Sequence, residues 1–139
     1  MKKKIFIFGH TGYIGSYLLK NLNNEEFETY GRKIPRPDNV NLYDFYYQFI
    51  NDFFNENNNI FCLINSAGNI DCQTKEDYFF NSKFDVIFQR VINEKKINTK
   101  YLSLNSTKIF SNSIDKYALS KKELDTNLIN NENFYTLYI

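Results

Sequence analysis

Short runs of apolar residues alternate along this chain with longer stretches in which apolar residues recur at helical spacing. The short runs predict strands buried in a sheet, and the stretches with a period near 3.6 residues predict amphipathic helices. Strands are expected at residues 5–8, 27–30, 40–43, 60–64, 101–104 and 134–139. Helices are expected at residues 14–22, 45–55, 81–94 and 114–128. Residues 34–39, which hold both prolines, and the polar residues 69–78 are expected to be irregular.

Strands that alternate with helices indicate an α/β fold with a parallel sheet and helices on both faces. We expect one domain over residues 1–139, built as a three-layer αβα sandwich with a doubly wound, Rossmann-type sheet of about six strands. The expected strand order is 3-2-1-4-5-6. Since this order reverses between strands 1 and 4, a ligand crevice is expected at their carboxyl ends.

The turn after the first strand reads Gly9-His10-Thr11-Gly12-Tyr13-Ile14-Gly15. A strand, a glycine turn and a helix in this order are typical of a dinucleotide-binding site. Gly9 would let the chain turn sharply, Gly12 would let the backbone approach a diphosphate, and Gly15 would let the helix pack closely. The alternative is a glycine-containing turn that binds nothing. Because three of only 5 glycines fall at this spacing, the pattern favours a cofactor.

Composition and charge exclude several classes of function. A formal net charge of +1 leaves no basic excess for non-specific nucleic-acid binding. Apolar runs stay well short of the roughly 18 residues of a membrane span, and the first ten residues lack the apolar core of a secretory signal. Cys62 and Cys72 are too few for a disulfide framework or a zinc site. We therefore expect a cytoplasmic protein with no metal, nucleic-acid or membrane partner.

Gly31-Arg32-Lys33 follows the predicted second strand. In a Rossmann domain an acidic residue at this point binds the adenosine ribose of NAD, whereas an arginine accommodates the 2′-phosphate of NADP. The absence of an acidic residue here favours NADP(H) over NAD(H). Basic residues that merely solvate a loop would give the same pattern.

Small and hydroxyl-bearing residues follow the other strands at the crevice. Asn65-Ser66-Ala67-Gly68 leaves room for a cofactor, although a plain tight turn would look the same. Ser106 lies just past residues 101–104, and Tyr117 and Lys121 are four residues apart, so they share one helix face. An ammonium beside a phenol is expected to lower the tyrosine pKa. Tyr117 could then exchange a proton with a substrate oxygen that Ser106 holds in place.

Together these motifs resemble the short-chain dehydrogenase/reductase superfamily. The glycine spacing, with Tyr13 and Ile14 between the last two glycines, is similar to its extended branch. That branch contains the NAD-dependent epimerases and dehydratases of nucleotide sugars and the dTDP-4-dehydrorhamnose reductases. The stretch Leu104-Asn105-Ser106-Thr107-Lys108-Ile109-Phe110 is similar to the branch's signature after its fifth strand. The resemblance runs from Ile5 to Ile139.

The resemblance implies an NAD(P)-dependent oxidoreductase or epimerase/dehydratase domain that acts on a nucleotide sugar. The resemblance implies that Ser106, Tyr117 and Lys121 are catalytic and that Lys121 also bonds the nicotinamide ribose. It also matches Asn81 to an asparagine that the family often has on the helix before the fifth strand. The residues expected to contact the dinucleotide are Gly9, Thr11, Gly12, Tyr13, Ile14, Gly15, Arg32, Asn65, Ala67 and Lys121.

Two departures from the extended branch limit this interpretation. Only ten residues separate Ser106 from Tyr117, a shorter connection than the branch usually has. Extended members also continue for a similar length beyond the position of Ile139, through the last strand and most of the sugar-nucleotide site. The chain is therefore expected to be a cofactor-binding part: a fragment, a truncated reading frame or a protein completed by a partner.

A sheet shortened in this way would expose an edge that favours association with a second copy or a complementing chain. The alternative function is a non-catalytic dinucleotide-binding module, or an inactive fragment that needs a partner.

Overall fold

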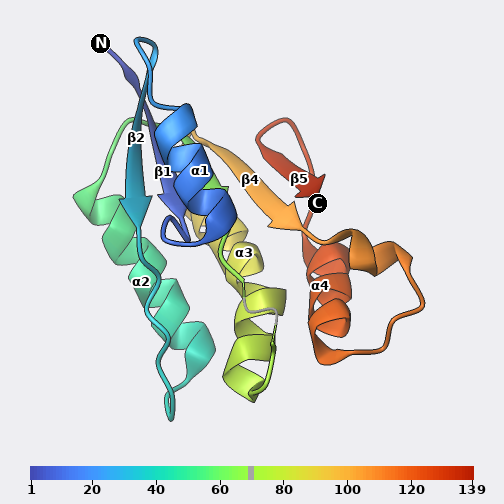
Figure 1. The fold of residues 1–139 in the computed structure, drawn as a ribbon. Coiled ribbons are helices and arrows are strands. Elements are labelled where there is room, and N and C mark those ends of the chain that lie inside the picture. Colours follow the sequence, from blue (N-terminus) through green and yellow to red (C-terminus); the bar gives the residue numbers. More distant parts are fainter. Residues whose placement is uncertain (69–70) are drawn as a thin grey trace.

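The computed structural model describes residues 1–68 and 71–139. All five of its strands pair in parallel, in the order β2-β1-β3-β4-β5. The strands are β1 (Lys3–Phe8), β2 (Phe27–Arg32), β3 (Ile60–Asn65), β4 (Lys100–Asn105) and β5 (Phe134–Tyr138). The helices are α1 (Tyr13–Asn21), α2 (Leu42–Glu56), α3 (Lys75–Lys95) and α4 (Lys116–Asn127), with a short 3-10 helix at Thr107–Phe110. The predicted α/β class and parallel, doubly wound sheet are confirmed (Figure 1).

The prediction of a strand at residues 40–43 is wrong, and so is the predicted number of six strands. Asn41 instead caps α2, because its side-chain oxygen accepts a hydrogen bond from the Asp44 amide at 3.1 Å. Val40 precedes Asn41, and helix α2 starts at Leu42, directly after the cap. With this strand removed, the remaining strands keep the predicted neighbours, so the reversal between β1 and β3 is where it was expected.

The irregular segment predicted at residues 69–78 is also partly wrong. Helix α3 begins at Lys75, after a capping box in which Thr74 accepts from the Asp77 amide and the Asp77 carboxylate accepts from the Thr74 amide. Residues 69–70 lie outside the described part of the chain. Along the described residues, no helix is long and apolar enough to cross a membrane.

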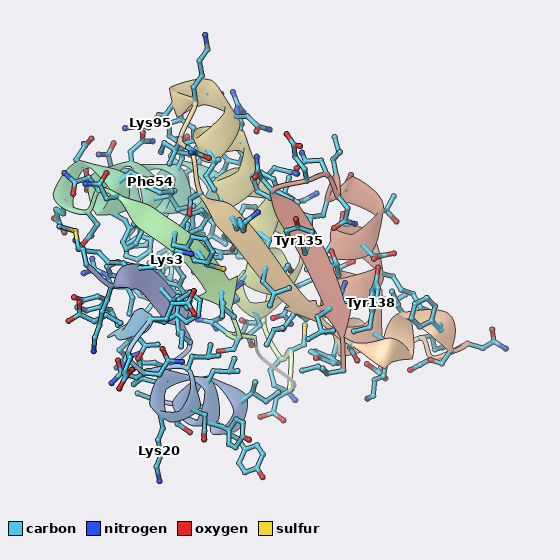
Figure 2. All side chains as sticks on the ribbon, turned by 90° about the horizontal axis from the view of Figure 1, so that it is seen from above. Lys3, Lys20, Phe54, Lys95, Tyr135 and Tyr138 are labelled. Carbon is cyan, nitrogen blue, oxygen red and sulfur yellow. The ribbon has the colours of Figure 1, made fainter. Side chains whose placement is uncertain are left out.

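The two faces of the sheet are covered differently. Helices α2 and α3 pack on one face, where buried rings of β1 and α3 meet: the Phe8 and Phe88 ring centres are 5.3 Å apart. Helix α1 covers the other face, with Leu18 and Leu19 packed against Ile5 and Ile7 of β1. Figure 2, which looks at the sheet from above, shows α1 alone on its side. These two apolar layers fix the strand ends from which the site is built.

Candidate functional site

The glycine turn brings three backbone segments into close contact. Gly9 has φ +79°, and a Cβ on it would lie 2.7 Å from the Ala67 amide nitrogen. A Cβ on Gly15 would lie 2.0 Å from the Gly9 carbonyl oxygen. Packing at the end of β1 therefore requires both glycines. Gly12 differs, because its Cβ would meet only the Gly9 oxygen at 3.5 Å and the residue is exposed. The Gly12 amide donates to the Gly9 carbonyl at 3.1 Å, so what Gly12 provides is space over the N-terminus of α1, where an anion could approach the amides of the first helical turn.

A cavity of about 280 Å³ lies over this turn. One wall is the turn itself, including Thr11 and Gly12, and another is the Ser66-Ala67-Gly68 segment after β3. Lys33 and Arg36, from the connection between β2 and α2, complete it with two cationic side chains. An amide-lined turn beside two cations has the chemistry that binds phosphate groups.

Arg32, which the sequence predicts as a cofactor contact, packs on helix α2 in this structure. Its guanidinium carbon is 5.6 Å from the centre of the Phe49 ring on α2, and Arg32 is not among the described residues that line the cavity. The positive charge at this point comes instead from Lys33 and Arg36. Tyr13 is 93% exposed and is likewise not among the described residues that line this cavity.

The segment after β3 is fixed to the end of β1 by hydrogen bonds. The Ser66 hydroxyl donates to the Phe8 carbonyl at 2.8 Å, and the Ser66 amide donates to the same oxygen at 3.0 Å. Asn65 is buried, and its side-chain oxygen accepts from the Ala67 amide at 3.0 Å. Asn65 therefore fixes the conformation of the turn by a buried hydrogen bond, while Ala67 lines the cavity.

A second cavity, of about 140 Å³, opens on the other side of the same segment. Ile14 of α1 lies at one side of it, and Leu104 and Asn105 at the end of β4 lie at another. Tyr117 and Lys121 of α4 also line it, as do Ser66, Ala67, Gly68 and Ile139. The two cavities share Ser66, Ala67 and Gly68, so one extended ligand could lie across both.

The structure brings Ser106, Tyr117 and Lys121 together at the end of β4. Asp115 caps α4 by accepting from the Ala118 amide at 2.8 Å, which places Tyr117 in the first turn of the helix. Ser106 is buried, and its hydroxyl accepts from the Lys108 amide at 3.1 Å. The same hydroxyl also interacts with the Tyr117 phenol. Tyr117 and Lys121 thus line one cavity, and Ser106 interacts with Tyr117.

The electrostatics of this group differ from the prediction. Burial raises the pKa of Tyr117, and hydrogen bonding from Ser106 only partly offsets it. The predicted lowering of the Tyr117 pKa is therefore wrong. Burial also lowers the pKa of Lys121, which is 4% exposed, while the Asp85 carboxylate acts in the opposite direction. A tyrosine with a raised pKa stays protonated at neutral pH and can act as a proton donor.

Three residues at the site were missed by sequence reasoning. Arg36 lines the first cavity, and its position among the prolines of the 34–39 loop gave little sign of this. His10 lines the same cavity and packs against Gly31, where a Cβ would lie 2.4 Å from the imidazole ring. Asp85 is buried beneath the site, on a helix whose other charges are mostly exposed. Only contacts between distant segments reveal these positions.

Comparison with known proteins gives the fold a context. No family model matches the sequence, and no curated protein matches it. Solved structures do match. A dTDP-4-dehydrorhamnose reductase from Clostridium acetobutylicum is 17% identical with a TM-score of 0.73, and the match covers 97% of this chain and 52% of that one. A dTDP-4-dehydrorhamnose reductase from Bacillus anthracis, solved in complex with NADP, is 18% identical with a TM-score of 0.68 over 99% of this chain and 53% of that one.

The enzyme WbmG from Bordetella bronchiseptica, in complex with NAD, is 11% identical with a TM-score of 0.69 over 99% of this chain and 53% of that one. The chain spans about half the length of these solved proteins. At such identities the likeness concerns the fold. The chain has a Rossmann-type fold that matches about half of each of these solved chains, two of which were solved in complex with NADP or NAD, and this agrees with the resemblance seen in the sequence.

Proposed function

We propose that this chain is the dinucleotide-binding part of an NAD(P)-dependent enzyme of the extended short-chain dehydrogenase/reductase type. The observation that carries the proposal is the pair of cavities that meet at Ser66-Ala67-Gly68. The glycine turn and two cations line one cavity, and the Tyr117 and Lys121 side chains line the other. A dinucleotide has the matching shape, with a diphosphate in the middle and a nicotinamide at one end.

The residues fit that cofactor. The first-turn amides of α1 would hold the diphosphate, and Gly12 would leave the space for it. Lys33 and Arg36 would pair with phosphate oxygens on the adenosine side, which favours NADP(H) over NAD(H). Ile14 would contact the nicotinamide side, and Lys121 would bond its ribose. When bound, the nicotinamide supplies the hydride that reduces a carbonyl carbon.

Tyr117 would then donate its phenolic proton to the carbonyl oxygen, so that the carbonyl becomes an alcohol. Like an ordinary tyrosine, Tyr117 is protonated at neutral pH and can supply the proton that reduction requires. Ser106, which interacts with the Tyr117 phenol, would hold the same oxygen. We propose a nucleotide-linked keto sugar as the substrate, since two of the similar structures are dTDP-4-dehydrorhamnose reductases.

The test combines a fluorescence titration with NADPH and NADH and an absorbance assay with a dTDP-linked 4-keto sugar. Tyr117→Phe should keep NADPH binding and lose about 100-fold or more in turnover. Tyr135→Phe is the matched control, because Tyr135 lies on β5 with its hydroxyl bonded to the Glu132 carbonyl, and it should keep its activity. Equal turnover in Tyr117→Phe and the unmodified chain would refute the catalytic assignment.

A non-catalytic dinucleotide-binding module is the second candidate. It is favoured by the Tyr117 pKa, which shows no activation of the phenol. This function predicts NADPH binding with no turnover of any keto sugar, and equal binding by the unmodified chain and Tyr117→Phe. A melting curve with NADPH separates both candidates from an inactive fragment, because a binder gains stability by mass action.

A further inference from the structure

The guanidinium of Arg36 rests on a buried aromatic ring. Its Cζ atom lies 3.5 Å from the centre of the Phe80 ring on α3, compared with 5.6 Å between Arg32 and the Phe49 ring. At 3.5 Å the two planar groups must lie face to face, because an edge-on guanidinium would push its nitrogen atoms into the ring. The N–H donors of an arginine lie in the guanidinium plane, so the stacking occupies none of them. Arg36 can therefore rest on Phe80 and still bind an oxyanion.

Phe80 is a rigid support for this contact. Its ring is 2% exposed and belongs to the larger apolar core of the sheet. The Phe84 ring stacks on it with the ring centres 4.9 Å apart, and the Tyr46 ring meets it edge-on at 5.7 Å. A side chain packed in this way offers Arg36 a fixed surface. Phe80 is not among the described residues that line the first cavity, so any effect on a ligand there would pass through Arg36.

The backbone that carries Arg36 is fixed as well. Ile34 is 6% exposed and packs into the same apolar core as Phe80. The Tyr46 hydroxyl donates to the Pro35 carbonyl at 3.2 Å. Arg36 therefore extends from an anchored backbone to an anchored ring. An arginine that is ordered before a ligand arrives loses less side-chain freedom on binding.

Arg36 lines two cavities that differ in charge. The first cavity, over the glycine turn, has no carboxylate among its described lining residues. The other cavity, of about 350 Å³, is lined in part by Asp38, Glu76 and Asp77. These carboxylates would attract a guanidinium that was free to move, and they would repel a phosphate. The stacked position keeps the guanidinium in the wall of the first cavity.

We propose that Phe80 is a positioning residue for phosphate recognition: its buried ring holds the Arg36 guanidinium in the wall of the first cavity, where the guanidinium selects a dinucleotide with a 2′-phosphate on its adenosine ribose. The role in cofactor selection rests on the function proposed above. The role in holding Arg36 does not, and it can be measured without any cofactor.

The contact itself is tested by NMR, through the Nε–H resonance of Arg36. The arginines of the chain are Arg32, Arg36 and Arg90, so Arg36→Gln assigns the signal. A proton above the face of an aromatic ring is shifted upfield by the ring current. In Phe80→Leu this upfield shift should disappear, because leucine fills the core but has no ring. Phe88→Leu is the matched control, since Phe88 is a fully buried ring of the same helix that packs against β1, and it should leave the Arg36 signal in place.

The role in selection is tested by fluorescence titration with NADPH and NADH. Phe80→Leu should weaken NADPH binding about fivefold, because the guanidinium must then be ordered on binding, and should change NADH binding by less than about twofold. Phe88→Leu should leave the ratio of the two affinities unchanged. In the Arg36→Gln background, Phe80→Leu should cost no further NADPH affinity. Should Phe80→Leu not fold, Phe80→Met makes the same comparisons, since methionine fills irregular core space without a ring.

The outcomes are distinct. An Arg36 signal that is the same in Phe80→Leu and the unmodified chain would overturn the inference, whether or not the chain binds a dinucleotide. An equal loss of NADPH and NADH affinity in Phe80→Leu would overturn the role in selection, and so would a loss of NADPH affinity that persists in Arg36→Gln/Phe80→Leu. A shifted Arg36 signal in a chain that binds neither cofactor would support the contact and refute the proposed function instead.

Discussion

Replacement of Gly15 by alanine tests the close approach on which the whole turn depends. Gly15 is buried in the first turn of α1, directly over the end of β1. The added methyl group would lie 2.0 Å from the Gly9 carbonyl oxygen and 2.7 Å from the Ser66 hydroxyl oxygen. Both are well inside van der Waals contact, and the nearer atom is backbone, which cannot rotate away. Helix α1 would have to move off the sheet or the Gly9 turn would have to deform.

The cost follows from these contacts. Overpacking of a well-packed site costs about 1–3 kcal/mol, and a clash with backbone belongs at the upper end of that range. Alanine recovers less than about 1 kcal/mol through its better helix propensity. The net loss should be about 2 kcal/mol in the free energy of unfolding. For a domain of this size that corresponds to a drop of roughly 8 °C in Tm.

Gly12→Ala is the matched control on the same turn. Its methyl group would meet only the Gly9 oxygen at 3.5 Å, an ordinary contact, and the backbone at Gly12 has φ −77°, which alanine adopts freely. Urea unfolding followed by circular dichroism should therefore show a loss below about 1 kcal/mol, which comes from alanine being a poorer N-cap than glycine. Cofactor affinity should respond the other way: NADPH should bind at least about tenfold more weakly to Gly12→Ala, because the methyl group occupies the surface proposed for the diphosphate. Equal stability of Gly15→Ala and Gly12→Ala would refute the packing described here.

Three further predictions concern other parts of the molecule. Arg36→Gln and Lys33→Gln should each weaken NADPH binding about tenfold and NADH binding much less, measured by fluorescence titration, and an equal loss for both cofactors would contradict the phosphate assignment. Burial raises the pKa of the Cys62 thiol to about 11, so its alkylation by iodoacetamide should remain slow up to pH 9 in the folded chain and become fast in urea; rapid reaction of the folded chain would contradict the burial of β3. Phe88→Ala should lower the free energy of unfolding by about 3–5 kcal/mol, because its ring is fully buried against Phe8, and a loss below 1 kcal/mol would contradict the core.

The sequence predicted the sheet well because its strands are short apolar runs closed by polar or glycine turns. The same reasoning failed at residues 40–43, where Val40, Leu42 and Tyr43 have the high strand propensity and apolar character of a short strand. The capping interaction between Asn41 and Asp44 decided in favour of a helix. Thr74 and Asp77 likewise form a helix-starting pattern that the polar composition of the segment concealed.

The candidate site was predictable where a motif lies within one turn or one helix. Gly9, Gly12 and Gly15 could be placed from their spacing, and Tyr117 and Lys121 from their common helix face. Arg32 could not, because the direction of its side chain depends on the packing of β2 against Phe49 of α2.

The buried position of Asp85 could not be predicted either, since its hydrogen-bond donors are 16 to 20 residues away in the chain. A charge on a helix is usually a solvated one, and only tertiary structure shows that this one is buried.

The most direct test of the account is an NMR titration with NADPH of the chain labelled with both nitrogen and carbon isotopes. Binding should perturb the backbone amides of Gly12 and Gly15 at the first cavity and the Tyr117 ring at the second cavity. The amides of Ala67 and Gly68, in the segment that both cavities share, should shift with them. Saturation at one equivalent with these two groups shifting in parallel would confirm that one dinucleotide spans both cavities. A folded chain whose glycine-turn amides stay unchanged at millimolar NADPH would contradict it.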